Sequence, residues 1–380
     1  MSEQQSEKKI HRGLIGVEFD RSTTTRIDGK KGELRYRGYS IHDLATYSSF
    51  EETAYLLMYG ALPTAAALQD FDGKIKAARR LPPQILDLLQ LMKDAHPMEA
   101  LRTAVSALGA FDPDFDNADP AVVLEKGIRL TSQVPMIVTA HHNIRQDRAV
   151  VAADPNLSHA ANFLYMLKGE APSAEAAKLM DMDFVLHAEH GSNASSFTAR
   201  VVTGTNANLH ASITAAVAAL SGPAHGGAAE DVMRMAREIG DPANAADYVK
   251  NKRQQRQAIT GFGHRVYKAE DPRARHMRDG VAALSEQMGE PVWFEILQAV
   301  VAAMAPYARH GIHVNVDFYS GVAYHLHGIT EDLFVPIFAI GRVPGWTVQV
   351  LEQLENNILI RPLLRYEGPD ALDYIPIDQR

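Results

Sequence analysis

The 380-residue sequence contains no cysteine. This absence excludes disulfide bonds, a thiolate nucleophile and cysteine-ligated zinc or iron–sulfur clusters. It also agrees with a reducing compartment, so we expect a cytoplasmic protein.

An excess of positive charge is missing as well. The formal net charge is -8 at pH 7. Nucleic acids and anionic membranes attract basic surfaces, so neither is an expected partner. A local basic cluster could still bind a single phosphate group.

Long uninterrupted apolar runs are also lacking. The first twelve residues are polar and have no apolar core of the signal-peptide kind, so we expect a short frayed tail. The longest run with few charges, from Leu333 to Leu351, is interrupted by Pro336, Arg342 and Pro344, which argues against a membrane span. At 46% hydrophobic residues, the chain can bury a large core and form two domains.

Strand patterns are nearly absent, and helical patterns fill most of the chain. Residues 22–39 predict one short hairpin that turns near Asp28 and Gly29. Ser49 with Glu52 forms a capping-box pattern, and Gly60 is the expected end of that helix. Further helices are expected after Thr64, Pro82, His96 and Ser173, and a loop over residues 111–121. The predicted fold class is therefore mainly α.

A polar stripe interrupts the apolar helix predicted over residues 174–190. Asp183, His187 and His190 are spaced so that they would share one helical face. A solvated face or hydrogen-bonded core histidines would explain the stripe, and so would a metal site built on the two histidines.

His225 stands between a helix stop and a helix start. Gly222 and Pro223 precede it, and Gly226 and Gly227 lead into the next helix. The positive end of that helix would favour a neutral imidazole, which can donate a hydrogen bond to a developing oxyanion. An ordinary turn histidine is the alternative.

The stretch GFGHRVYKAEDPRA, residues 261–274, concentrates several chemically useful groups. Gly261 and Gly263 allow a ligand to approach the main chain, and His264 can exchange protons near neutral pH. Asp271 is predicted to cap a helix beginning at Pro272, which leaves Arg273 at a helix end where only an anionic partner would explain it. No third glycine or preceding strand supports a dinucleotide fold.

Nearby basic residues suit a phosphorylated ligand, although a solvated charge run would look the same. They are Lys252, Arg253, Arg256 and Lys268.

Three charged residues stand in apolar surroundings. Asp317 lies between Val316 and Phe318, so it either pairs with a cation or has a raised pKa suited to a general base. Arg342 and Arg361 each need an anionic partner from the protein or from a ligand. Together with the histidines, they suggest a small di- or tricarboxylate held beside acid–base groups.

Three motifs now become recognisable. GPAHGGA around His225, GFGHRVYK with DPRA around His264, and NVDFYSG around Asp317 resemble the signatures of the citrate synthase family. The resemblance runs from GLIGVEFD at Gly13 through HAEHGSNAS to IRP at Pro362, nearly the whole chain.

The resemblance implies a large helical domain, residues 1–221 and 325–380, and a smaller helical domain, residues 222–324, with the active site in the cleft between them. It implies a homodimer that condenses acetyl-CoA with oxaloacetate and hydrolyses citryl-CoA, with no metal or redox cofactor. The chain has no counterpart of the extra N-terminal domain of the NADH-inhibited relatives, so no inhibition by NADH is expected.

The resemblance also implies a role for each matched residue. Asp317 would take a proton from the acetyl methyl group, His225 would stabilise the resulting enolate, and His264 would protonate the oxaloacetate carbonyl oxygen. The remaining matches are substrate-binding His187, His190, Arg273 and Arg342, Arg361 from the partner subunit, and CoA-binding Ala258, Ile259, Thr260, Gly261, Phe262 and Lys268.

Some positions depart from the family pattern. Gly191 and Ser192 replace an acidic residue common in relatives, and Leu363 replaces a basic one. These departures concern substrate preference and CoA affinity. The closest alternative is 2-methylcitrate synthase, which uses propionyl-CoA, because one methylene changes preference by only about 1–3 kcal/mol. A metal-dependent hydrolase using His187, His190 and Asp317 is an alternative from another class, and a catalytically silent helical binding protein is a third.

Overall fold

A computed structural model describes residues 9–380, so the first eight residues of the predicted N-terminal tail lie outside it. The part described is mainly helical, as predicted, with sixteen α-helices and one small sheet. The α-helices are α1 (Ile41–Tyr47), α2 (Phe50–Tyr59), α3 (Ala65–Ala77), α4 (Pro83–Leu91), α5 (Pro97–Gly109), α6 (Pro120–Arg145), α7 (His159–Lys168), α8 (Ala174–His187), α9 (Ala194–Thr203), α10 (Leu209–Leu220), α11 (Ala228–Ile239), α12 (Ala245–Gln254), α13 (Ala274–Met288), α14 (Pro291–Met304), α15 (Asp317–Leu326) and α16 (Phe334–Glu355). Short 3-10 helices occupy η1 (Arg12–Leu14), η2 (Pro242–Asn244), η3 (Ala305–His310), η4 (Glu331–Leu333) and η5 (Ile377–Gln379).

The predicted hairpin is confirmed and is extended by a third strand. The strands β1 (Thr25–Asp28), β2 (Glu33–Tyr36) and β3 (Tyr39–Ser40) pair antiparallel in the order β1-β2-β3. The third strand is only two residues long, so it gives no alternating pattern in the sequence. Gly38, with φ 92°, allows the tight reversal between β2 and β3.

Local capping signals predicted several helix ends correctly. Ser49 Oγ accepts a hydrogen bond from the Glu52 backbone N–H at 3.2 Å, and Gly60 ends the helix with φ 85°. Ser173 caps α8 in the same way. These interactions span only a few residues, which is why the sequence reveals them.

Two predicted helix boundaries are wrong. Helix α8 ends at His187, so His190 lies beyond it and does not share a helical face with Asp183 and His187. The hydroxyl of Tyr36 lies 2.7 Å from the Glu189 carbonyl oxygen and accepts from the Glu189 N–H at 3.3 Å. This contact between distant segments satisfies backbone groups that a longer helix would have used.

Helix α13 begins at Ala274, two residues later than predicted. Asp271 Oδ1 accepts a hydrogen bond from the Arg273 backbone N–H at 3.0 Å, and residues 272 and 273 form a turn before the helix. Asp271 therefore does cap this segment, but at the turn rather than at the helix itself.

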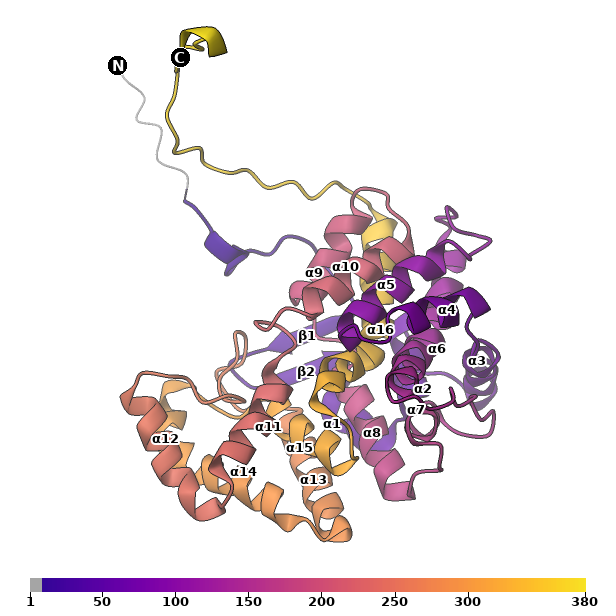
Figure 1. Ribbon diagram of the computed structural model, residues 1–380, viewed down its shortest axis with the longest axis vertical. Helices are drawn as coiled ribbons and strands as arrows, with labels where there is room; N and C mark the ends of the chain where they lie inside the picture. Colours follow the sequence, from indigo (N-terminus) through magenta and orange to yellow (C-terminus); the bar gives the residue numbers. More distant parts are fainter. Residues whose placement is uncertain (1–8) are drawn as a thin grey trace.

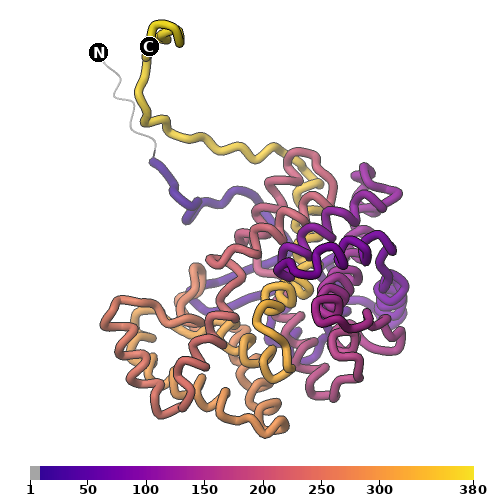
Figure 2. Tube along the Cα trace, viewed as in Figure 1, coloured from indigo at the N-terminus to yellow at the C-terminus, as the bar shows by residue number. Residues whose placement is uncertain are grey.

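Helix α16 forms the centre of the molecule. It packs against α2, α6, α8, α9 and α10, which surround it in Figures 1 and 2. By length and composition alone, residues 331–355 and 291–310 could each cross a membrane, but the first stretch is almost entirely buried within the protein. A buried apolar helix is what the core of a helical domain requires.

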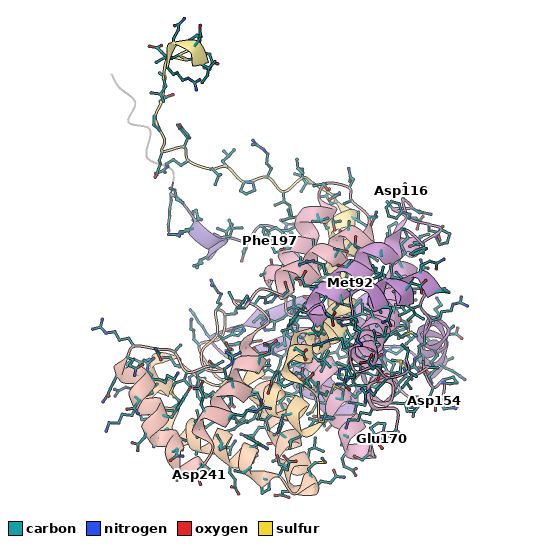
Figure 3. The ribbon with its side chains drawn as sticks, in the orientation of Figure 1. Met92, Asp116, Asp154, Glu170, Phe197 and Asp241 are labelled. Carbon is teal, nitrogen blue, oxygen red and sulfur yellow. The ribbon has the colours of Figure 1, made fainter. Side chains whose placement is uncertain are left out.

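The helices from the predicted smaller domain gather at one side. Helices α11 to α14 form the lower-left group in Figure 1, where Figure 3 labels Asp241. Helix α15 packs on α11 and α13, while α13 also contacts α8. The boundaries at residues 222 and 324 stay a prediction.

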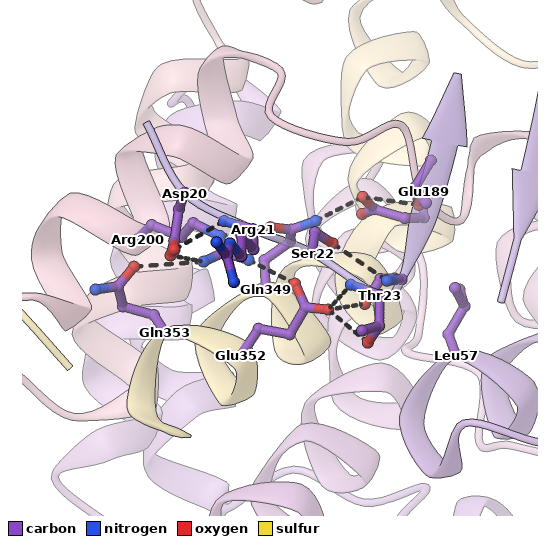
Figure 4. A network of polar contacts seen from close by, with 12 residues as sticks. Asp20, Arg21, Ser22, Thr23, Leu57, Glu189, Arg200, Gln349, Glu352 and Gln353 are labelled. Atoms are coloured by element: carbon purple, nitrogen blue, oxygen red, sulfur yellow. Dashed lines mark hydrogen bonds and ion pairs between the residues drawn. The ribbon is translucent and has the colours of Figure 1, made fainter. Parts of the chain in front are cut away.

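The two ends of the described chain extend away from the helical body. Residues 357–380 follow α16 as a tail that is irregular apart from η5. Asn357 is still bonded to the Thr203 carbonyl oxygen at 3.1 Å, and the far part of the tail stands clear of the body in Figure 3. Leu363 and Leu364 are 80% and 98% exposed. At the other end, Asp20 is held to the body by Arg200, whose contacts with α16 are drawn in Figure 4.

Candidate active site

Three rings from two distant loops meet at the centre of the site. The ring centroids of His190 and His264 are 5.3 Å apart, and that of Tyr267 lies 4.7 Å from His264. His190 Nε2 is hydrogen-bonded to the Tyr267 hydroxyl at 3.0 Å. The structure thus brings together two of the predicted histidines through Tyr267, to which the sequence had assigned no role.

The loop backbone fixes the tautomer of His264. Its Nδ1 accepts hydrogen bonds from the backbone N–H groups of Val266 at 3.0 Å and Tyr267 at 3.1 Å. A neutral imidazole with an acceptor at Nδ1 carries its proton on Nε2. Burial and the nearby Arg273 lower the pKa of His264 to about 4, so the neutral form dominates at pH 7. His264 therefore presents a neutral N–H donor.

His225 is oriented through Ser195, the residue after the start of α9. The Ser195 backbone N–H donates to His225 Nε2 at 3.3 Å, and Ser195 Oγ lies 2.9 Å from the same nitrogen. Trp346 Nε1 donates to Ser195 Oγ at 3.0 Å. Because Nε2 accepts from the backbone, the neutral ring carries its proton on Nδ1.

The expectation of a neutral His225 agrees with its surroundings. Burial, and then the charge of Arg342, lower the pKa of His225 to about 4. Helix α11 begins three residues later, at Ala228. Ser195 was missed as a site residue although HAEHGSNAS was part of the recognised pattern, because a serine gives no chemical signal until its neighbours are known.

Asp317 is the first residue of α15 and carries an unpaired carboxylate. Its side chain makes no hydrogen bond or ion pair with any other residue in the range 9–380. Burial raises its pKa, while His187 and Arg273 lower it in part. A carboxylate without a partner is available to accept a proton.

A second buried carboxylate fixes the helix that carries Asp317. Asp183 on α8 accepts hydrogen bonds from Ser320 Oγ at 3.1 Å and from the Tyr324 hydroxyl at 2.7 Å, both on α15. His187 Nδ1 lies 2.9 Å from the Asp183 carbonyl oxygen, and its buried Nε2 has no hydrogen-bond partner within residues 9–380. The polar stripe on α8 therefore joins two helices rather than facing solvent.

Arg273 has the anionic partner that the sequence required, supplied by its own turn. Its Nε and Nη2 atoms reach Asp271 Oδ1 and Oδ2 at 2.9 and 2.7 Å. Both side chains are buried. This fork-to-fork pair fixes the plane of the guanidinium and leaves further N–H groups for a ligand.

Arg342 is buried without such a partner. Its Nε donates to the His187 carbonyl oxygen at 2.5 Å, its guanidinium lies 4.7 Å from the Phe338 ring centroid, and Nη1 has no partner in the described chain. Burial lowers its pKa to about 10, and the nearby Glu189 opposes that change. The pKa of Glu189 is itself raised to about 7 by burial. An anionic ligand would satisfy Nη1.

The predicted CoA segment packs against the start of α15. Gly261, with φ 79°, lies so close that an added Cβ would be 2.5 Å from the Phe318 ring. The Asn315 backbone N–H donates to the Gly261 carbonyl oxygen at 2.9 Å, and the rings of Phe262 and Phe318 meet edge to face. Gly261 and Phe262 therefore lie against Phe318, the residue after Asp317, and the side chain of Lys268 is exposed.

Arg361 is the predicted site residue that the structure does not bring to the others. It lies on the exposed tail that leaves the body in Figure 1. Of the departing positions, Leu363 lies on the same tail, and Gly191 adopts φ 58° directly after His190.

The arrangement of His187 and His190 does not resemble a metal-binding pair. Across residues 9–380, no group of three or more His, Asp or Glu side chains has an arrangement that could hold a metal ion. His187 Nδ1 is engaged by a backbone carbonyl, and His190 lies outside the helix assumed for the paired ligands.

Comparison with known proteins gives consistent similarities. Residues 13–363 match the family described as "Citrate synthase, C-terminal domain". A citrate synthase of Haloferax volcanii is 43% identical, covering 98% of this chain and 99% of its own. A protein of Corynebacterium glutamicum named 2-methylcitrate synthase 1 is 39% identical, covering 99% and 100%.

Solved structures of citrate synthases are also similar to this chain. A citrate synthase from Pyrobaculum aerophilum superimposes with a TM-score of 0.93 at 40% identity, covering 98% of this chain and 95% of its own. A citrate synthase from Thermoplasma acidophilum, solved as a ternary complex with carboxymethyl coenzyme A and oxaloacetate, gives a TM-score of 0.93 at 30% identity, covering 98% and 100%.

Proposed function

Because the chain belongs to the citrate synthase family, we propose that it condenses acetyl-CoA with oxaloacetate and hydrolyses the citryl-CoA formed to citrate and CoA. The observation that carries this proposal is the combination of two neutral imidazole N–H donors, His225 and His264, with the unpaired carboxylate of Asp317. Condensation of an enolate with a ketone needs one base to form the enolate, and one hydrogen-bond donor for each of the two oxygens on which negative charge develops.

Each of the three groups takes one task. Asp317 removes a proton from the methyl group of acetyl-CoA, and the Nδ1–H of His225 stabilises the thioester oxygen as the enolate forms. The methyl carbon then attacks the keto carbon of oxaloacetate, and His264 transfers its Nε2 proton to the keto oxygen. Water finally cleaves the thioester, which releases citrate and CoA.

The remaining predicted residues bind the substrates. His190, Arg273 and Arg342 hold the oxaloacetate carboxylates, with His187 beside them, and the free Nη1 of Arg342 supports this assignment. Residues 258–262 cradle CoA, and the exposed Lys268 contacts a CoA phosphate. Closure of residues 222–324 over the remainder of the chain excludes water during condensation. The reaction requires no metal or redox cofactor and takes place in the cytoplasm.

A homodimer completes the site. Arg361 is carried by a tail whose exposed apolar side chains, among them Leu363, Leu364 and Tyr366, would be costly to leave in water. In a dimer this tail lies on the partner subunit, and Arg361 reaches the partner's substrate there. Sedimentation equilibrium of the wild-type chain tests the assembly, and a monomer at micromolar concentration would contradict it.

The decisive experiment measures free thiol released from acetyl-CoA and from propionyl-CoA, each with and without oxaloacetate. We expect thiol release that depends on oxaloacetate and is faster with acetyl-CoA. Faster release with propionyl-CoA would favour 2-methylcitrate synthesis, the activity named for the Corynebacterium glutamicum relative. Release without oxaloacetate, abolished by a chelator, would instead indicate a metal-dependent hydrolase.

Substitution of the proposed base supplies the control. Asp317→Asn should lower kcat by at least about 100-fold. The far-ultraviolet circular dichroism spectrum should stay unchanged. Near-normal turnover of this variant would contradict the assignment of Asp317.

A further inference from the structure

The turn between β1 and β2 lies directly on the loop that carries His264. The Gly29 carbonyl oxygen accepts a hydrogen bond from the Lys268 backbone N–H at 2.7 Å. A Cβ atom added at Gly29 would lie 2.2 Å from the Val266 carbonyl oxygen. At Gly32, an added Cβ would lie 2.7 Å from the Glu270 carbonyl oxygen. Two glycines of one turn are thus in contact with the backbone of residues 266–270.

The contact, and not the turn conformation, requires glycine at position 29. Gly32 has φ 68°, a conformation that other residues adopt at a cost, but Gly29 is outside this left-handed region. The φ angle of Gly29 is therefore one that an alanine can adopt. Only the closeness of Val266 forbids it.

The segment held by Gly29 is the one that orients His264. The backbone N–H groups of Val266 and Tyr267 bond to His264 Nδ1 and place its proton on Nε2. Lys268, bonded to Gly29, is the next residue. A displacement of this segment would therefore be transmitted through two hydrogen bonds to the imidazole.

The same sheet also contacts the loop that carries His190. Tyr36, at the end of β2, contacts the backbone of Glu189, the residue before His190. Ile27 on β1 lies 3.5 Å from the position of a Cβ at Gly191. One small sheet is therefore in contact with both the loop of His190 and the loop of His264, whose ring centroids are 5.3 Å apart.

We propose that the β1–β2 turn is a positioning element for the active site, and that Gly29 is a positioning residue that holds residues 266–268 so that His264 presents its Nε2–H to the substrate. The kinetic consequence rests on the proposed function of His264. The structural consequence, the tautomer and orientation of the imidazole, does not.

The test compares Gly29→Ala with Gly73→Ala. Gly73 lies exposed in α3, and an added Cβ there meets no atom within 4 Å. An error of about 1 Å in placing a catalytic group can cost about 100-fold in rate. We expect kcat/KM for oxaloacetate to fall at least about tenfold in Gly29→Ala and to stay unchanged in Gly73→Ala.

A second pair of variants keeps the test valid if Gly29→Ala fails to fold. Gly32→Ala adds backbone strain and a contact with Glu270, whereas Gly38→Ala, at φ 92° with no atom within 4 Å of its Cβ, adds strain alone. Lower kcat/KM in Gly32→Ala than in Gly38→Ala supports the proposal. Equal values would contradict it.

Nitrogen-15 NMR of histidine-labelled protein gives a readout that needs no turnover. The His264 signal, assigned with His264→Gln, should show a protonated Nε2 in the wild type and in Gly73→Ala, and a changed or averaged tautomer in Gly29→Ala. If the wild type releases no thiol but the signal changes as expected, the proposed function fails and the positioning role stands. A folded Gly29→Ala protein with the wild-type signal and wild-type kinetics would overturn the positioning role alone.

Discussion

Ser195 Oγ and His225 Nε2 lie 2.9 Å apart, although thirty residues separate them in the chain. The same hydroxyl accepts the indole N–H of Trp346 from α16. This small network connects α9 and the central helix to the proposed enolate-stabilising histidine. The orientation of His225 is therefore set by residues far from its own turn.

Replacing Ser195 by alanine should reduce activity without unfolding the protein. Loss of a hydrogen bond worth about 0.5–1.5 kcal/mol leaves the imidazole less well oriented, so kcat should fall roughly tenfold. Steady-state thiol release at saturating oxaloacetate measures this. Ser196→Ala is the matched control, because Ser196 is equally buried and both serines are bonded to Asn193, but only the Ser195 hydroxyl lies within hydrogen-bond distance of His225. An equal loss in both variants would contradict the specific role of Ser195.

Arg342→Met should separate ligand binding from stability. Arg342 is buried with one N–H group unpaired, so its removal costs few protein contacts, while a ligand carboxylate loses bonds worth about 1.5–3 kcal/mol. The Kd for oxaloacetate, measured by calorimetry, should rise about 10- to 100-fold. The free energy of unfolding should fall by at most about 1 kcal/mol.

Arg200 supplies the control for Arg342. It is equally buried but bonds to Gln349 and Glu352, both drawn in Figure 4. Arg200→Met should lower the free energy of unfolding by about 3–5 kcal/mol, because charged partners are left unpaired. A stability loss in Arg342→Met as large as that in Arg200→Met would show that Arg342 is structural.

Tyr324→Phe should destabilise the protein. The hydroxyl of Tyr324 donates to the buried carboxylate of Asp183, and its loss leaves an acceptor poorly satisfied at a cost of about 1–3 kcal/mol. Urea unfolding measures this change. Tyr248→Phe loses a bond to Glu238 near the surface and should change stability by less than about 0.5 kcal/mol. Equal effects of the two variants would refute the anchoring role of Asp183.

His159→Gln should make stability less sensitive to acid. Burial, and then the charge of Arg79, lower the pKa of His159 to about 3 from its ordinary value of 6.5. The unfolded state therefore binds the proton more readily between pH 3 and 6.5, and the wild type loses stability as the pH falls below about 6.5. At pH 5 this single histidine costs about 2 kcal/mol relative to pH 8.

The measurement compares the free energy of unfolding at pH 8 and pH 5. The difference should be smaller in the variant by about 2 kcal/mol. His310→Gln, in which an exposed histidine is replaced, controls for the loss of an imidazole as such. An unchanged pH dependence in His159→Gln would mean that this histidine does not contribute to acid unfolding.

The sequence by itself determined the fold class and several helix ends, and it supplied the candidate acid–base groups. Capping serines, glycines that end helices and helical periodicity act over a few residues, so Ser49, Gly60 and Ser173 could be assigned without tertiary information. Arg273 and Arg342 were recognised as residues that require explanation, because a buried cation is costly wherever it lies.

Only the tertiary structure decided where α8 ends, which hydrogen bonds fix the imidazoles, and that the β1–β2 turn contacts the His264 loop. Tyr36 stops the helix before His190 and Ser195 orients His225, each across a long stretch of sequence. These are contacts between single polar atoms on distant segments. They leave no periodicity or composition in the sequence, because their geometry exists only once the intervening chain has packed.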